Sequence, residues 1–161
     1  DTRIGGVPPT DPVGTYEVTS SVVTVQLAGA EVEAMVREPV GAEGDRPGVV
    51  FVHGAGTGRY DQAFVAQAEA LASAGIVTLV PNKRLDTYST RDRSYVAMAN
   101  DYLRSVELLR GLPGVDPDRV GVYGESEGAW IVPVMAADNP TVAFVVLVAA
   151  PVVPPRQQAA F

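Results

Sequence analysis

Short, continuous apolar runs alternate with segments of helical periodicity from residue 49 onward. The first run is Val49-Val50-Phe51-Val52, which is typical of a strand covered on both faces in a parallel sheet. Further runs occupy residues 76–80, 120–123 and 142–148, and each is expected to form a buried strand. Apolar residues within 64–72, 95–109 and 129–137 recur at the spacing of helices. Strands and helices that alternate through short connections predict a doubly wound, mostly parallel α/β sheet.

The N-terminal part of the chain follows a different pattern. Residues 18–27 and 32–37 are β-rich and are separated by Ala28-Gly29-Ala30, which predicts an antiparallel hairpin beside the parallel strands. Residues 1–15 are rich in glycine and proline and show no periodicity, so an extended arm is expected there. The chain has 161 residues, which is enough for a single α/β domain over residues 1–161.

Composition excludes several classes of function. The formal net charge is −7, and Lys83-Arg84 is the only adjacent pair of cations, which argues against nucleic acid or an anionic membrane surface as a partner. The longest apolar run, 142–153, contains Pro151 and is too short to span a bilayer. The absence of cysteine excludes disulfides, thiolate catalysis and cysteine-ligated zinc. The N-terminal arm favours a secreted or cell-envelope protein over a cytoplasmic one.

The strand predicted at 120–123 leads directly into Gly124-Glu125-Ser126-Glu127-Gly128, and a helix follows at once. This is G-x-S-x-G in a strand–turn–helix context, the nucleophile elbow. The turn is so tight that the serine backbone is strained and a Cβ at either glycine would collide with its neighbours. The elbow places the Ser126 hydroxyl at the carboxyl edge of the sheet, where open α/β folds bind ligands. Ser126 is therefore the predicted catalytic nucleophile.

A second glycine-rich turn, His53-Gly54-Ala55-Gly56, follows the strand at 49–52. Such a turn lets backbone N–H groups point towards the serine. The N–H groups of Ala55 and Glu127 are the predicted oxyanion hole, where negative charge develops on a substrate oxygen. The alternative is an ordinary tight turn between a strand and a helix.

Nucleotide binding is a rival interpretation of the same glycines. A dinucleotide fingerprint needs glycine at position 59, where the chain has Arg59, and an acidic residue after the next strand, where it has Asn82. No phosphate-binding lysine motif is present either. We therefore predict no nucleotide, flavin or metal cofactor.

Four blocks of the sequence resemble the α/β-hydrolase superfamily, in particular bacterial serine hydrolases related to prolyl oligopeptidase and dienelactone hydrolase. The blocks are VVFVHGAGTG at 49–58, LASAGIVTLVPNKR at 71–84, VDPDRVGVYGESEGA at 115–129 and VAFVVLVAAPVVP at 142–154. The resemblance covers roughly residues 18–154. It implies the fold predicted above and cleavage of a small acyl substrate, an ester, thioester or amide, through an acyl-enzyme.

The chain departs from the family pattern at several positions. Asn82 stands where the family usually has aspartate, and Leu85 where it has glycine. Glu125 replaces a common histidine before the serine, so that carboxylates flank Ser126 on both sides. These carboxylates either oppose anionic substrates or simply face solvent. The solvent-facing alternative is the expected one, because the elbow leaves its variable positions partly exposed.

The base and the acid of a catalytic triad are missing from the predicted site. In the resembling family they follow the serine, but after Ser126 the sequence has no histidine and a single aspartate, Asp138. The one histidine, His53, matches an oxyanion-loop residue of the family and is expected to fix the turn rather than to act as the base. In the resembling family the base and the acid follow two further strands after 142–148, so the domain over residues 1–161 is expected to be incomplete, with its C-terminal strands absent. A C-terminal fragment or a second chain is therefore expected to supply the base and the acid, beyond a cap region starting near Arg156. The alternative is a non-catalytic binding protein on a hydrolase scaffold.

Overall fold

A computed structural model describes residues 16–56, 58–85, 94–137 and 139–150. The predicted arm at 1–15, Asp138 and the segment around Arg156 lie outside these residues. The strands are β1 (Val18–Leu27), β2 (Ala30–Pro39), β3 (Arg46–Val52), β4 (Val77–Pro81), β5 (Val115–Glu125) and β6 (Val145–Val148). The helices are α1 (Val65–Ser73), α2 (Tyr95–Arg110) and α3 (Gly128–Ala136).

The described strands form one mixed sheet in the order β1-β2-β4-β3-β5-β6. β4, β3, β5 and β6 run parallel to one another, and the β1–β2 hairpin lies antiparallel beside β4. The predicted doubly wound sheet with an N-terminal hairpin is confirmed. β5 begins earlier than the apolar run at 120–123, because a register irregularity against β3 lets Val115 pair with Arg46.

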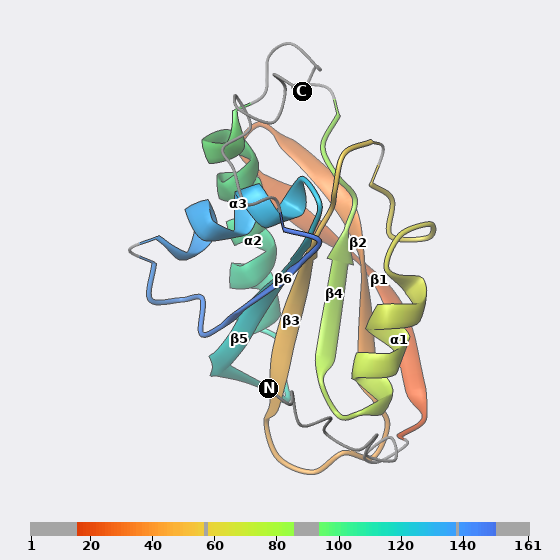
Figure 1. The fold of residues 1–161 in the computed structure, drawn as a ribbon. Coiled ribbons are helices and arrows are strands. Elements are labelled where there is room, and N and C mark those ends of the chain that lie inside the picture. Colours follow the sequence, from red (N-terminus) through yellow and green to blue (C-terminus); the bar gives the residue numbers. More distant parts are fainter. Residues whose placement is uncertain (1–15, 57, 86–93, 138, 151–161) are drawn as a thin grey trace, which may run out of the picture.

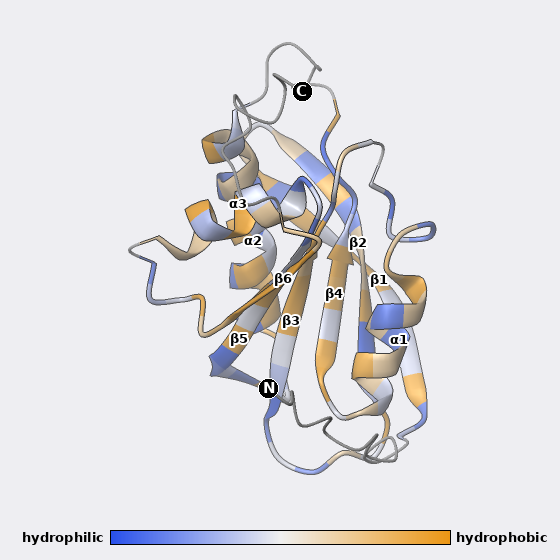
Figure 2. Cartoon of the chain, in the orientation of Figure 1, coloured by the Kyte–Doolittle hydropathy of each residue, from blue (hydrophilic) through white to orange (hydrophobic). Residues whose placement is uncertain are grey.

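Helices cover both faces of the sheet (Figure 1). Side chains alternate along β3, so Val50 and Val52 enter the core under α2 and α3, while Val49 and Phe51 enter a smaller core under α1. β3 and β4 are coloured as the most apolar of the central strands in Figure 2, as expected for strands that are buried on both faces. The candidate site lies in the turns that follow β3, β4 and their neighbour β5.

The strand predicted to be buried at 142–148 is different in the structure. β6 covers only Val145–Val148, and Val145, Val146 and Leu147 are 44%, 38% and 42% exposed. The prediction of a buried strand is wrong for the described residues, because β6 is the last strand of the described sheet and pairs with β5 alone. An apolar edge strand of this kind is open to pairing with a further strand.

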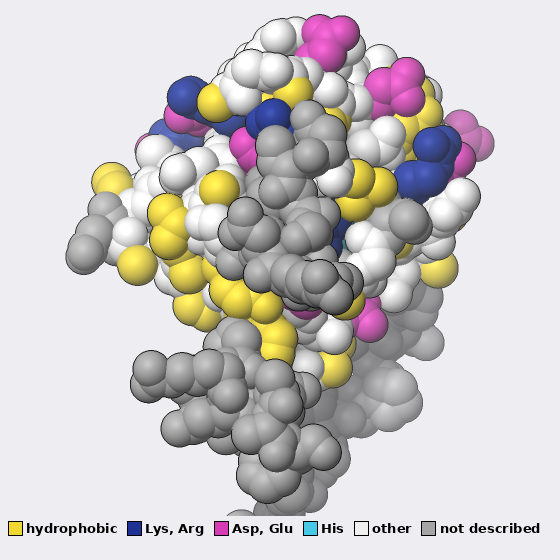
Figure 3. Space-filling view, turned by 90° about the horizontal axis from the view of Figure 1, so that it is seen from above, with side chains coloured by type: hydrophobic (Ala, Val, Ile, Leu, Met, Phe, Trp, Pro, Cys, Tyr) yellow, Lys and Arg dark blue, Asp and Glu magenta, His cyan; other side chains and the backbone are white. Residues whose placement is uncertain are grey.

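The carboxyl ends of the parallel strands meet at the edge seen from above in Figure 3. Hydrophobic side chains gather on this face together with a few charged ones. The turns after β3, β4 and β5 all lie at this edge, which is where open α/β sheets place ligands.

Candidate functional site

Ser126 lies at the turn between β5 and α3, as the motif predicts. Its backbone has a φ of 54°, a left-handed conformation that non-glycine residues rarely adopt. The turn is held by hydrogen bonds from the Ser126 N–H to the Val148 carbonyl, at 3.1 Å, and from the Ala129 N–H to the Ser126 carbonyl, at 3.0 Å. Ser126 is exposed at the carboxyl edge although its neighbours on both sides are at least partly buried. The backbone therefore presents its hydroxyl to the outside.

Both glycines of the motif are required by close packing. A Cβ at Gly128 would lie 2.3 Å from the Val52 carbonyl oxygen, and one at Gly124 would lie 2.6 Å from the Gly128 carbonyl oxygen. Both distances are shorter than real Cβ contacts, and in each case the obstructing atom belongs to the backbone. Steric contact alone thus explains why the turn has glycine on either side of Glu125-Ser126-Glu127.

The turn after β3 passes directly beside Ser126. A Cβ built on Gly54 would lie 3.4 Å from the Ser126 Cβ and 3.9 Å from the Glu127 nitrogen. The structure therefore brings the loop of Ala55 next to the elbow, and the role of the Ala55 and Glu127 N–H groups as oxyanion-hole donors stays a prediction. An open pocket of about 390 Å³ lies at this junction, and its lining includes Ala55, Ser126 and His53.

One wall of the pocket is aromatic. Phe64 lines the pocket, and its ring centroid lies 5.0 Å from that of Phe51 and 5.8 Å from that of Tyr123. Phe64 also has a left-handed backbone, with a φ of 60°, which is unusual for a bulky residue. Burial raises the pKa of Tyr123, and the nearby Glu125 carboxylate raises it further. Because Phe64 lines the pocket, this aromatic wall can contact the apolar part of a ligand.

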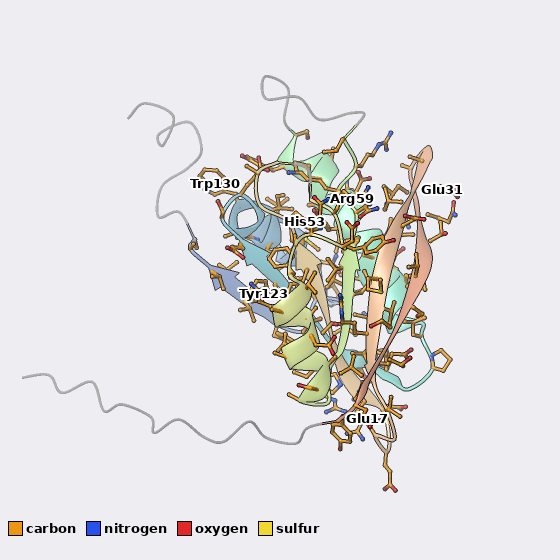
Figure 4. The ribbon with its side chains drawn as sticks, turned by 90° about the vertical axis from the view of Figure 1, so that its right-hand side faces the viewer. Glu17, Glu31, His53, Arg59, Tyr123 and Trp130 are labelled. Carbon is orange, nitrogen blue, oxygen red and sulfur yellow. The ribbon has the colours of Figure 1, made fainter. Side chains whose placement is uncertain are left out.

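Figure 4 shows His53 among the side chains at the upper end of the sheet, where it is 2% exposed. A hydrogen bond fixes its ring. The ring Nε2 lies 2.6 Å from the Pro81 carbonyl oxygen, which can only accept, so Nε2 carries the proton of the neutral ring. Burial lowers the pKa of His53 to about 4, the Lys83 charge acts in the same direction, and the bond to Pro81 opposes both. These contacts fit the predicted role in fixing the turn.

The ring of His53 is expected to stay neutral from pH 8 down to about pH 5, because its pKa in the folded protein is about 4 against 6.5 for an unperturbed histidine. The unfolded chain takes up this proton first as the pH falls, so stability decreases below about pH 6.5 and loses up to about 3 kcal/mol by pH 4. An NMR titration can follow the ring directly, since the sequence has only one histidine. A titration midpoint near 6.5 in the folded protein would contradict the lowered pKa of His53.

Glu127 does not face solvent, contrary to the expectation for the variable positions of the elbow. Its carboxylate lies 2.7 Å from the Lys83 ammonium, and the side chains are 3% and 5% exposed. Burial of a carboxylate requires a partner, and Lys83 reaches it from the turn after β4, which sequence spacing does not reveal. Glu125 is partly buried and lines the pocket.

Sequence reasoning did not single out Lys83 as a site residue. The signal in the sequence was a lysine two residues after a buried strand, at the edge where the elbow glutamate also lies. Asn82, which precedes Lys83 in this turn, also contacts the segment after β3. Its side-chain oxygen accepts a hydrogen bond from the Tyr60 N–H at 2.9 Å.

In the described part of the chain, acidic and histidine residues form no cluster of three or more that could bind a metal ion. None of the helices in that part has the length and apolar character needed to cross a bilayer.

Comparisons with known proteins relate the chain to α/β hydrolases. The family described as BAAT / acyl-CoA thioester hydrolase C terminal matches residues 101–161, which include the elbow. Among solved structures, a dienelactone hydrolase from Anabaena variabilis is 26% identical, with a TM-score of 0.67 over 81% of this chain and 62% of its own. A hypothetical protein from Pseudomonas aeruginosa is 24% identical, with a TM-score of 0.68 over 81% of this chain and 42% of its own.

A third solved structure is brefeldin A esterase, described as a bacterial homologue of human hormone-sensitive lipase. It is 25% identical, with a TM-score of 0.57 over 76% of this chain and 35% of its own. The chain thus spans less than two thirds of the length of each of these three structures. None of the curated proteins matches it.

Proposed function

We propose that this chain, which has the fold of the α/β hydrolases, carries the nucleophile of a serine hydrolase that cleaves a carboxylic ester, thioester or amide. The observation that carries the proposal is the left-handed backbone of Ser126, which is held between two glycines that have no room for a Cβ. Backbone strain of this kind persists where the surrounding structure enforces it, and it is concentrated at functional sites.

The reaction follows from the groups at the pocket. The Ser126 oxygen attacks the acyl carbon while its proton passes to a base, and the N–H groups of Ala55 and Glu127 stabilise the negative charge on the carbonyl oxygen. Within the described residues, no hydrogen-bond partner occupies the Ala55 N–H, which leaves it available for this role. The bond to the leaving group then breaks, and that group departs with the proton. Water attacks the acyl-enzyme in the same way and releases the acid and free Ser126.

The base and the acid are proposed to come from polypeptide outside this sequence, either a continuation or a second chain. The only histidine, His53, is already bonded to Pro81, which favours this proposal over direct catalysis by His53. The greater length of the similar structures and the exposed apolar edge of β6 also support it, since a further strand could pair there.

The native protein, isolated with any polypeptide that accompanies it, provides the test. Denaturing mass spectrometry with peptide sequencing is expected to find a histidine-bearing segment, and a chromogenic ester is expected to give a burst of one alcohol product per Ser126 before steady turnover. A folded protein that binds esters with neither a burst nor steady turnover would instead support a non-catalytic binding protein on this scaffold.

Glu125 is expected to select against anionic substrates, because its carboxylate lines the same pocket as Ser126. Glu125→Gln should raise kcat/KM for an ester with a negatively charged acyl group by about five-fold, the equivalent of roughly 1 kcal/mol, with little change for a neutral ester of the same length. Glu43→Gln, on an exposed loop at the opposite edge of the sheet, is the matched control. Equal effects of Glu125→Gln on both esters would refute this role.

A further inference from the structure

We propose that Lys83 is a positioning residue of the oxyanion hole. Its ammonium group joins the two segments that carry the proposed donors, the turn of Ala55 and the elbow of Glu127, and holds them in a fixed relation. The inference rests on the proposed function, because it concerns how the same site stabilises negative charge.

Lys83 makes one contact to each segment. Its ammonium donates to the Gly54 carbonyl oxygen at 3.0 Å and to the Glu127 carboxylate at 2.7 Å. The side chains of both members of the ion pair are almost fully buried. Charge-assisted hydrogen bonds in such surroundings are short and well defined, so the ammonium fixes both partners.

The contact with Gly54 acts directly on a proposed donor. The Gly54 carbonyl and the Ala55 N–H belong to the same planar trans peptide group, in which the oxygen and the hydrogen point in opposite directions. Fixing the oxygen towards Lys83 therefore directs the N–H of Ala55 away from Lys83. A cation at the oxygen also polarises the peptide group and makes its N–H a stronger donor.

The contact with Glu127 acts on the second donor through the side chain of the same residue. Glu127 is the N-cap of α3, and its backbone N–H is the other proposed oxyanion-hole donor. Lys83 thus links a side chain of the elbow to a carbonyl of the neighbouring turn. Loss of the ammonium removes this link, and the two proposed donors are then expected to be less well aligned.

The backbone around Lys83 is itself fixed to the turn after β3. The Lys83 N–H donates to the Gly58 carbonyl oxygen at 2.8 Å, and Pro81 and Asn82 accept hydrogen bonds from His53 and Tyr60. A Cβ on Gly58 would lie 2.9 Å from the Lys83 Cβ, which shows how closely the two turns approach. The backbone that carries the Lys83 side chain is therefore firmly held.

A purely stabilising role explains this pair less well. The desolvation of two buried charges largely offsets their attraction, and well-packed apolar residues often serve stability equally well. What an ammonium adds is directional hydrogen bonding to two acceptors at once, and a site that stabilises a developing charge depends on that precision.

The experiment measures the reaction of Ser126 with a fluorophosphonate in the native protein. The serine oxygen–phosphorus bond forms as the phosphorus–fluorine bond breaks, fluoride leaves, and the hydroxyl proton passes to the base. Lys83→Met is expected to lower the rate constant of this step at least about ten-fold while the affinity for the unreacted probe stays within about two-fold. Lys83→Arg, which keeps a cationic donor, should recover most of the rate.

Two further variants separate positioning from stability. Arg37→Met removes another buried cation, paired with Glu69 at 3.4 Å, and should lower the urea midpoint without changing the rate constant. Glu127→Gln keeps the size of the side chain but removes the charge, and should reduce the rate to a smaller extent, which provides a readout if Lys83→Met does not fold.

The outcomes are distinct. The inference would be overturned if Lys83→Met or Glu127→Gln folds and reacts within two-fold of the wild-type rate. It would also be overturned if Arg37→Met lowers the rate constant as much as Lys83→Met does. Failure of the wild-type protein to react at Ser126 would overturn the proposed function and this inference with it. Wild-type reaction with an unaffected Lys83→Met would leave the proposed function intact.

Discussion

Replacing Ser126 with alanine is expected to lower kcat/KM for ester cleavage by at least about 10⁴-fold. The variant lacks the oxygen that forms the acyl-enzyme, and the remaining oxyanion-hole donors and substrate contacts supply only residual catalysis. The fold should be unaffected, because Ser126 is exposed and the backbone around it is held by main-chain hydrogen bonds. Steady-state kinetics of the native protein and of the variant, on the same ester, provide the measurement.

Ser73→Ala is a matched control for this variant. Ser73 is a partly exposed serine at the end of α1, and its hydroxyl donates to the Ala70 carbonyl oxygen at 2.9 Å, away from the pocket. The control should retain wild-type kcat/KM. Activity of Ser126→Ala above about a tenth of wild type would show that another group is the nucleophile.

The second large effect is expected from Gly128→Ala. The added Cβ would lie 2.3 Å from the Val52 carbonyl oxygen, at the point where the start of α3 packs against the end of β3. Since the obstructing atom belongs to the backbone of a central strand, relief requires the strand and the elbow to separate. We expect a loss of more than about 3 kcal/mol in the free energy of unfolding, measured by urea denaturation.

Gly111→Ala tests whether this effect is steric. A Cβ at Gly111 would lie 3.5 Å from the nearest carbonyl oxygen, an ordinary contact, and its backbone is helical at the end of α2. This substitution should leave stability unchanged or slightly raised. Equal losses in both variants would contradict the steric account, and a stable Gly128→Ala would do so most clearly.

The sequence predicted the arrangement of the fold because that arrangement depends on local patterns. The apolar run at 49–52 indicates a strand that is buried on both faces, and it forms part of β3. The periodicity at 95–109 indicates a helix that is buried on one face, and it forms α2. The same pattern at 142–148 gave the wrong burial for β6. An apolar run shows that a strand is suited to being covered, but not which neighbour covers it.

The candidate site was likewise predictable from the sequence only in part. Ser126 and its glycines were predictable, because the five-residue motif and the strand and helix on either side of it can be seen in the sequence, although the atom that excludes a Cβ at Gly128 belongs to β3. The burial of Glu127 was not, because its partner Lys83 lies 44 positions away and reaches it from a different strand. Pairings across strand ends depend on the three-dimensional order of the sheet, which no spacing along the chain encodes.

The central claim, that Ser126 is an activated nucleophile, is tested most directly by locating the site of fluorophosphonate modification. The native protein is treated with the probe and digested, and the modified peptide is sequenced by mass spectrometry. The predicted result is a single adduct on Ser126 that disappears in Ser126→Ala. A folded native protein in which Ser126 stays unmodified, or in which an adduct on another residue persists in that variant, would contradict the claim.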